Sequence, residues 1–152
     1  RIRKTINARV DLIGEDTLDG ELQKHAVNIG VDAHVTFHGF LPQPTVLEIV
    51  SRSDLYVQTS HHEAAGVSVL EAAAAGVPAV GMRAGYVADW SPSKALAIRD
   101  ATPESLAEGI VTLYGDANRR RSIAAEARAL SIAHDVSWSA AQFDQLYRQL
   151  RA

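Results

Sequence analysis

Two glutamates, Glu63 and Glu71, stand with seven residues between them where an apolar strand is predicted to give way to a helix. The strand is predicted over residues 54–58 and the helix over 70–75, which places Gly66 at the turn between them. Carboxylates accept hydrogen bonds from hydroxyl groups. The start of a helix leaves about four backbone N–H groups unpaired and carries a partial positive charge. The segment therefore combines acceptors for hydroxyls with a site suited to phosphate.

The order of these groups along the chain assigns a role to each. A diphosphate near the amides of Gly66, Val67 and Ser68 would gain hydrogen bonds and a favourable field. Glu63 precedes the turn and is expected to accept from the hydroxyls of a sugar beyond the phosphates. Glu71 lies one turn into the helix and is expected to accept from a ribose. This layout predicts a site for a sugar nucleotide.

A purely structural interpretation competes for both glutamates. Residues 68–71 read Ser-Val-Leu-Glu, which is also a capping box, in which Glu71 bonds back to the start of its own helix. Glu63 taken alone fits a solvated loop carboxylate. The strand before, the glycine between and the helix of small residues after favour the binding site.

Strand-like and helix-like segments alternate along the whole chain, a pattern typical of a parallel sheet with helices on both faces. No linker or internal repeat interrupts this order, so residues 1–152 are predicted to form one α/β, Rossmann-like domain. Trp138 and Tyr147, in the last helix, are expected to dock onto its core. The predicted strands are 8–13, 34–37, 54–58, 78–82 and 95–98, and the predicted helices are 18–29, 44–51, 70–75, 103–114, 117–132 and 137–151.

In an open parallel sheet, ligands bind beyond the carboxyl ends of the strands, where loops from neighbouring units face one crevice. The predicted strand ends place Gly14, Phe40, Leu41, the 60–66 segment and Gly85 at this edge. Single glycines also fit ordinary turns. Together, these loops are the candidate walls of the binding site.

His61, His62 and Glu63 are residue types that bind zinc. Adjacent side chains of an extended segment point to opposite faces, and no second pair of ligands appears at helical spacing. No metal site is therefore predicted, and His62 is expected to line the ligand pocket.

Composition narrows the class of protein. The chain has 152 residues, 47% hydrophobic and 22% charged, which suits one globular domain. Its formal net charge of −3 is dispersed and favours neither nucleic acid nor an anionic membrane. There is no cysteine, and no apolar run approaches the roughly 20 residues of a spanning helix. A cytoplasmic location is expected, free or peripheral to the inner face of the membrane.

The Glu63 to Val80 segment resembles the E-x7-E motif of the retaining GT-B glycosyltransferases of family four, or group 1. That motif usually reads Glu-Gly-Phe-Gly, an apolar run and Glu-Ala. Here Glu63 is followed by Ala-Ala-Gly, and Glu71 opens the run Glu-Ala-Ala-Ala-Ala-Gly-Val-Pro-Ala-Val. Ala64 and Ala65 depart from the usual pattern. The resemblance extends from about residue 8 to residue 150.

This resemblance implies a C-terminal donor-binding domain, the second half of a GT-B fold. It implies a nucleotide diphosphate sugar as donor substrate, no cofactor, and no covalent enzyme nucleophile. In the family, the loop matching Phe40 and Leu41 holds the base through main chain, and the loop matching Gly85 lies near the sugar and phosphates. Glu63 and Glu71 would be the principal active-site residues.

The chain begins with Arg1 and is expected to be a fragment of a longer enzyme. The domain's first strand, its basic diphosphate contacts and the N-terminal domain that binds the acceptor would then lie upstream. Any membrane association would come through that missing half. The fragment alone is expected to be inactive.

Three other function classes stay open at this point. A dinucleotide-dependent oxidoreductase would share the fold class, but only Gly14 stands where its G-x-G-x-x-G fingerprint is required. A non-hydrolysing sugar-nucleotide epimerase would share the GT-B fold. A degenerate, non-catalytic nucleotide-binding or interaction module is the third alternative.

Overall fold

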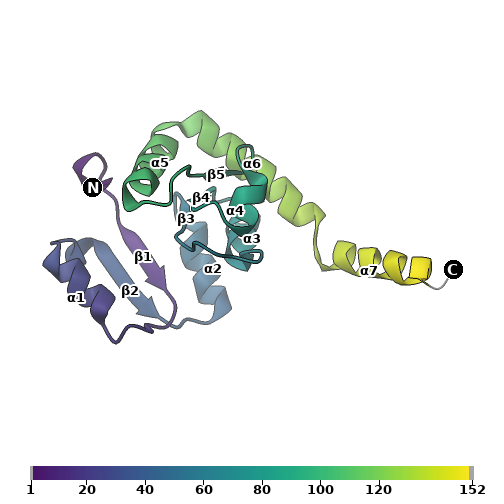
Figure 1. Ribbon diagram of the computed structural model, residues 1–152, viewed down its shortest axis with the longest axis horizontal. Coiled ribbons are helices and arrows are strands. Elements are labelled where there is room, and N and C mark those ends of the chain that lie inside the picture. Colours follow the sequence, from purple (N-terminus) through teal and green to yellow (C-terminus); the bar gives the residue numbers. More distant parts are fainter. Residues whose placement is uncertain (1, 151–152) are drawn as a thin grey trace.

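The computed structural model describes residues 2–150 (Figure 1). Its strands are β1 (Val10–Ile13), β2 (Val35–Gly39), β3 (Tyr56–Gln58), β4 (Ala79–Gly81) and β5 (Ala95–Ala97). Its α-helices are α1 (Glu21–Asn28), α2 (Gln43–Ser51), α3 (Val67–Ala74), α4 (Gly85–Trp90), α5 (Pro103–Gly115), α6 (Ala117–Ala133) and α7 (Val136–Leu150), and two 3-10 turns are η1 (Ile2–Lys4) and η2 (Asp32–His34). All five predicted strands are present, and every strand pair is parallel, as predicted.

The strands form two sheets rather than one continuous sheet. β1 pairs with β2, and a second sheet has the order β3-β4-β5. Figure 1 shows β1 and β2 beside α1, whereas β3 to β5 are surrounded by α3 to α6. Within the described residues no strand joins the two sheets, so both outer edges of each sheet lack a strand partner. Alternation along the sequence predicted the strands, but it does not encode whether neighbouring edges meet.

The three-stranded sheet is covered on both faces. Successive residues of a strand point to opposite sides. Accordingly Ala79 of β4 packs in one cluster with Val87 of α4, whereas Val80 packs in another with Ile110 of α5. The prediction of helices on both faces is confirmed for this sheet. Burial of these apolar side chains is the main stabilising term of the domain.

Helix α6 contributes to both clusters. Its Ile123 belongs to the cluster with α5, and Ala127, one turn later, belongs to the cluster with α3 and α4. The helix is capped at its start by Asp116, whose side chain accepts from the Arg119 amide at 2.9 Å. This helix therefore ties the two helical layers together.

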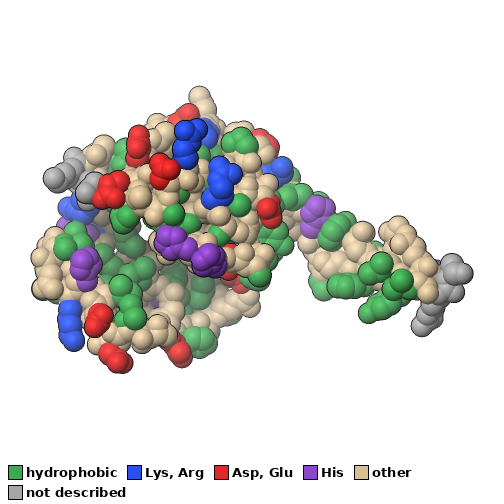
Figure 2. Space-filling view, in the orientation of Figure 1, with side chains coloured by type: hydrophobic (Ala, Val, Ile, Leu, Met, Phe, Trp, Pro, Cys, Tyr) green, Lys and Arg blue, Asp and Glu red, His purple; other side chains and the backbone are tan. Residues whose placement is uncertain are grey.

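Helix α7 differs from its prediction. It extends away from the rest of the molecule (Figure 1), and none of its described residues is buried. Trp138 and Tyr147 are 43% and 62% exposed, so the expectation that they dock onto the core is wrong. The Trp138 ring instead contacts His134, with the ring centroids 4.2 Å apart. Apolar side chains gather along this arm in Figure 2.

Acidic and basic side chains are interspersed on the face shown in Figure 2. Within residues 2–150 no helix combines the length and the apolar character needed to cross a bilayer.

Candidate functional site

The turn between β3 and α3 forms where the sequence predicts it. Gly66 adopts a left-handed conformation with φ 88°, and α3 begins at Val67, earlier than the predicted residue 70. A Cβ at Gly66 would lie 2.9 Å from Oε1 of Gln58, so glycine is required for both conformation and space. Val69 donates its amide to the Gly66 carbonyl at 2.9 Å. The amides of Val67 and Ser68 precede this first hydrogen bond of the helix. Amides at the start of a helix are suited to binding an anion.

The capping-box interpretation of Glu71 is wrong. The helix is capped by Gly66 rather than Ser68, with no side-chain hydrogen bond to the cap. The Ser68 hydroxyl accepts a hydrogen bond from the Tyr56 hydroxyl at 2.7 Å. Oε1 of Glu71 accepts from Nε2 of Gln43 at 2.7 Å. A capping box fails because the helix starts one residue before Ser68, which moves Glu71 beyond the first turn.

The Gln43–Glu71 hydrogen bond brings α2 to α3. Gln43 is the first residue of α2 and follows Leu41 and Pro42, so Glu71 lies beside the loop that leaves β2. In that loop, Phe40 is 75% exposed and Leu41 is partly buried. Gln43 was not predicted as a site residue, because nothing in the local sequence indicates which helix its side chain meets.

Glu63 lines a hollow of about 460 Å³ formed by the loops after β3 and β4. The hollow also contains Arg83, which sequence reasoning did not select, and the predicted pocket residue His62. Its full lining is His61, His62, Glu63, Ala64, Arg83 and Ala84. Its volume is within the range of about 300–1,000 Å³ typical of small-ligand sites. Glu63, His62 and Arg83 are all exposed to solvent.

Gly85 lets the two loops that form this hollow pack closely against each other. Its φ is 48°, and a Cβ there would lie 2.4 Å from the Ala65 carbonyl oxygen and 3.0 Å from Cβ of Glu63. The amide of Tyr86 donates to the same Ala65 oxygen at 2.8 Å. The structure thus brings Gly85 against the Glu63 loop. It also shows Gly85 starting helix α4, where only a turn was predicted.

Gln58 lies beneath this site and is 3% exposed. Its Nε2 donates to the Ala84 carbonyl at 3.0 Å, and its Oε1 lies against Gly66. No hydrogen-bond partner for Oε1 is found among the described residues. The side chain therefore spans the two loops that form the site. A glutamine ending a buried strand was the available sequence signal, because buried polar groups normally have a structural or functional partner.

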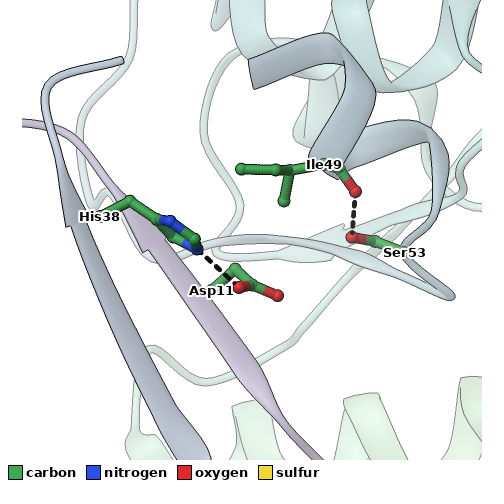
Figure 3. Close-up of polar contacts among 4 residues, drawn as sticks. All are labelled: Asp11, His38, Ile49 and Ser53. Carbon is green, nitrogen blue, oxygen red and sulfur yellow. Dashed lines mark hydrogen bonds and ion pairs between the residues drawn. The ribbon is translucent and has the colours of Figure 1, made fainter. Parts of the chain in front are cut away.

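Gly14 follows β1 and so lies at the end of the two-stranded sheet, not of the sheet that contains β3. Its amide donates to the Gly39 carbonyl at 2.9 Å, which places it beside the loop that carries Phe40. Near these strand ends, Nε2 of His38 in β2 lies 2.7 Å from Oδ1 of Asp11 in β1 (Figure 3). The same figure shows the hydroxyl of Ser53, just after α2, donating a hydrogen bond to the Ile49 carbonyl. No hydrogen bond described in residues 2–150 links Gly14 to the α3 turn.

The carboxylate of Asp16, in the loop after β1, has a lowered pKa. Asp16 accepts hydrogen bonds from the amides of Leu18 and Gly20 at 2.9 and 2.7 Å. Chiefly the Leu18 amide, followed by that of Gly20, lowers the pKa of Asp16. No group of three or more His, Asp or Glu side chains suited to a metal ion is found in the described part of the chain.

Comparisons with known proteins bear on what this site does. Residues 1–130 match the family described as glycosyl transferases group 1. Over 125 residues the chain is 28% identical to the GDP-mannose-dependent alpha-(1-6)-phosphatidylinositol dimannoside mannosyltransferase of Mycobacterium tuberculosis (strain ATCC 25177 / H37Ra), which covers 82% of this chain and 32% of that protein. The chain thus spans about a third of this curated relative.

Two solved structures have the same fold. Sucrose-phosphate synthase from Thermosynechococcus elongatus aligns with a TM-score of 0.83 at 23% identity, over 98% of this chain and 40% of that one. Anabaena HepE in complex with UDP aligns with a TM-score of 0.82 at 23% identity, over 93% of this chain and 41% of the other. The family match covers most of the chain and the fold is that of the GT-B enzymes, and on this evidence the chain belongs to the glycosyl transferases group 1 family.

Proposed function

We propose that this chain is the donor-binding domain of a glycosyltransferase that moves a sugar, with retention, from a nucleotide diphosphate sugar to an acceptor. The observation that carries the proposal is the placement of the two glutamates of the E-x7-E motif. Glu63 lines the hollow formed by the loops after β3 and β4, and Glu71 of α3 is hydrogen-bonded to Gln43 at the start of α2. A nucleotide sugar spanning this turn would meet a carboxylate at each end.

The diphosphate fits between the two glutamates, at the start of α3. As the glycosidic bond breaks, negative charge grows on the departing phosphate. The amides of Val67 and Ser68 are fixed by the Gly66 turn and would stabilise this charge without reorganising. Helix α3 adds its positive end to the same position.

The remaining groups orient the donor. Glu63 would accept hydrogen bonds from the sugar hydroxyls, and Glu71 from the ribose. The base would lie along the main chain of Phe40 and Leu41, which directly precede the helix that carries Gln43. Gly85 acts indirectly, by allowing the Glu63 loop to approach the loop after β4. Neither glutamate serves as a covalent nucleophile, and no cofactor takes part.

The acceptor would be bound by a further domain of a longer protein, through which contact with a membrane surface would also arise. The mycobacterial relative is described as GDP-mannose-dependent, and the HepE structure contains UDP. These descriptions support a nucleoside diphosphate sugar as donor for this chain and leave its base and sugar to experiment. The family match favours sugar transfer over the oxidoreductase, epimerase and non-catalytic alternatives.

Ligand-observed NMR with a panel of UDP, GDP and ADP sugars tests the proposal. Because one wall of the cleft is supplied elsewhere, we expect the 152-residue chain to bind the matching donor weakly, with a Kd on the order of 0.1–1 mM. We expect no sugar transfer by the chain alone, since donor and acceptor must be held together in a closed cleft. Binding of NAD in preference to every sugar nucleotide would contradict the proposal.

A further inference from the structure

Arg83 and Glu63 line the same hollow, but no ion pair joins their side chains among the described residues. Arg83 lies in the loop after β4, is exposed, and faces the same hollow as His61 and His62. None of the ion pairs or side-chain hydrogen bonds found among residues 2–150 involves its guanidinium. A guanidinium offers five N–H donors in a planar fork that matches the oxygens of a phosphate.

Hydrogen bonds hold the backbone of the loop that contains Arg83. Buried Gln58 donates to the Ala84 carbonyl at 3.0 Å, and the Ala84 amide donates to the Met82 carbonyl at 2.8 Å. On the far side, the Tyr86 amide bonds to Ala65. These three hydrogen bonds hold the loop in place. Ligand binding therefore has to order only the long side chain of Arg83, which keeps the entropic cost of binding small.

Rigid support, an unpaired guanidinium and a hollow of ligand size together point to an anion site. We propose that Arg83 binds a phosphate oxygen of the donor in this hollow. This inference rests on the proposed function and adds to it a specific cation for the diphosphate. Glu63 would take the uncharged hydroxyls and Arg83 the charged end, so the two side chains discriminate between the two parts of a sugar phosphate.

The shared chemistry is an anionic oxygen, which has two sources. It belongs to the diphosphate of every nucleotide sugar, or to an acidic substituent on the sugar itself. Binding of the uridine and guanosine series as nucleoside, monophosphate and diphosphate, together with inorganic pyrophosphate, reports the first source. A comparison of UDP-glucose with UDP-glucuronic acid reports the second.

The test uses Arg83→Gln and Arg83→Lys, with Arg121→Gln as the control because Arg121 is exposed on α6 and bonds only to Asn118 among the described side chains. We expect Arg83→Gln to weaken diphosphate and pyrophosphate binding about tenfold and to leave nucleoside binding unchanged. Arg83→Lys keeps the charge but loses the fork, and should retain part of the affinity. The difference between wild type and Arg83→Gln should shrink as the salt concentration rises.

Equal affinities of wild type and Arg83→Gln for diphosphate and pyrophosphate would overturn the assignment, as would an equal loss for the nucleoside. A loss confined to UDP-glucuronic acid would also overturn it, by placing the anion on the sugar. Pyrophosphate binding that depends on Arg83, without binding of any nucleotide, would support Arg83 and contradict the proposed function. Absence of all binding would overturn both, once the folded state of each variant has been verified from its amide NMR spectrum.

Discussion

Nε2 of Gln43 donates a hydrogen bond of 2.7 Å to Oε1 of Glu71, and this contact joins the start of α2 to the middle of α3. The two residues are 28 positions apart in sequence, and each belongs to a different strand-loop-helix unit. The bond fixes the orientation of the carboxylate from outside its own helix. Glu71 is therefore positioned for a ligand beside the loop after β2, rather than used to cap α3.

Replacement of this carboxylate separates binding from stability. Glu71→Gln keeps the size of the side chain and should change the free energy of unfolding by well under about 1 kcal/mol, since no cap is lost. Loss of a charged acceptor for ribose hydroxyls should weaken nucleotide binding by roughly 1.5–3 kcal/mol. Calorimetric titration with the best-bound nucleoside diphosphate measures the second effect. Glu126→Gln on α6 is the matched control, and equal affinities of wild type and Glu71→Gln would exclude the ribose role.

Glu63 should distinguish the sugar from the nucleotide. It lines a hollow whose lining does not include Val67 or Ser68, so Glu63→Ala should leave affinity for the free nucleoside diphosphate nearly intact and reduce affinity for the complete donor about tenfold. Titrations of both ligands against both proteins give the comparison directly. Comparable losses for the two ligands would show that Glu63 does not read the sugar.

Gly85 is predicted to be essential to the architecture of the hollow. In Gly85→Ala the new Cβ would meet the Ala65 carbonyl oxygen at 2.4 Å in a left-handed conformation, so the loop must shift. We expect a loss of about 1–3 kcal/mol in the free energy of unfolding, together with weaker donor binding. Denaturant unfolding measures the first quantity.

Gly115→Ala is the control for that experiment, because Gly115 ends α5 and a Cβ there meets no atom within 4 Å. It should leave stability unchanged or raise it slightly, since alanine restricts the unfolded chain. A destabilisation as large as that of Gly85→Ala would remove the special role of Gly85.

Asp16 should make the stability of the loop after β1 depend on pH in the acid range. Amide hydrogen bonds from Leu18 and Gly20 stabilise the carboxylate form and lower the pKa of Asp16 in the folded state. Because the folded pKa is lower than the unfolded one, this contribution to stability is complete above the unfolded value of about 3.9 and is lost as pH falls through the folded pKa.

An NMR titration of the carboxyl carbon of Asp16 tests this sign. Its midpoint should lie below the value of about 3.9 that is usual for an aspartate, and the amide signals of Leu18 and Gly20 should move with the same midpoint. In Asp16→Ala these amide shifts should disappear from the acid range. A midpoint for Asp16 at or above about 3.9 would contradict the assigned cause.

The sequence by itself determined most of the local structure of this chain, although helix α4 was not predicted. Short apolar runs between helix-like segments indicated all five strands, since such runs are a property of neighbouring residues. Thr102 before Pro103 predicted the start of α5, and its side chain does accept from the Ser105 amide at 3.2 Å. Gly66 was correctly placed at the turn before α3, because the run of helix formers after a strand requires such a turn. The resemblance of the Glu63 to Val80 segment to the family's E-x7-E motif indicated the family, and the family match over residues 1–130 confirms it.

Contacts between distant segments were decided only by the tertiary structure. The bond from Gln43 to Glu71, the shared hollow of Glu63 and Arg83, and the buried amide of Gln58 all depend on which loops pack together. The division of the strands into two sheets and the exposure of α7 are of the same kind. A side chain's partner is chosen by packing across the whole chain, where burial and hydrogen bonding act between residues whose proximity no local pattern records.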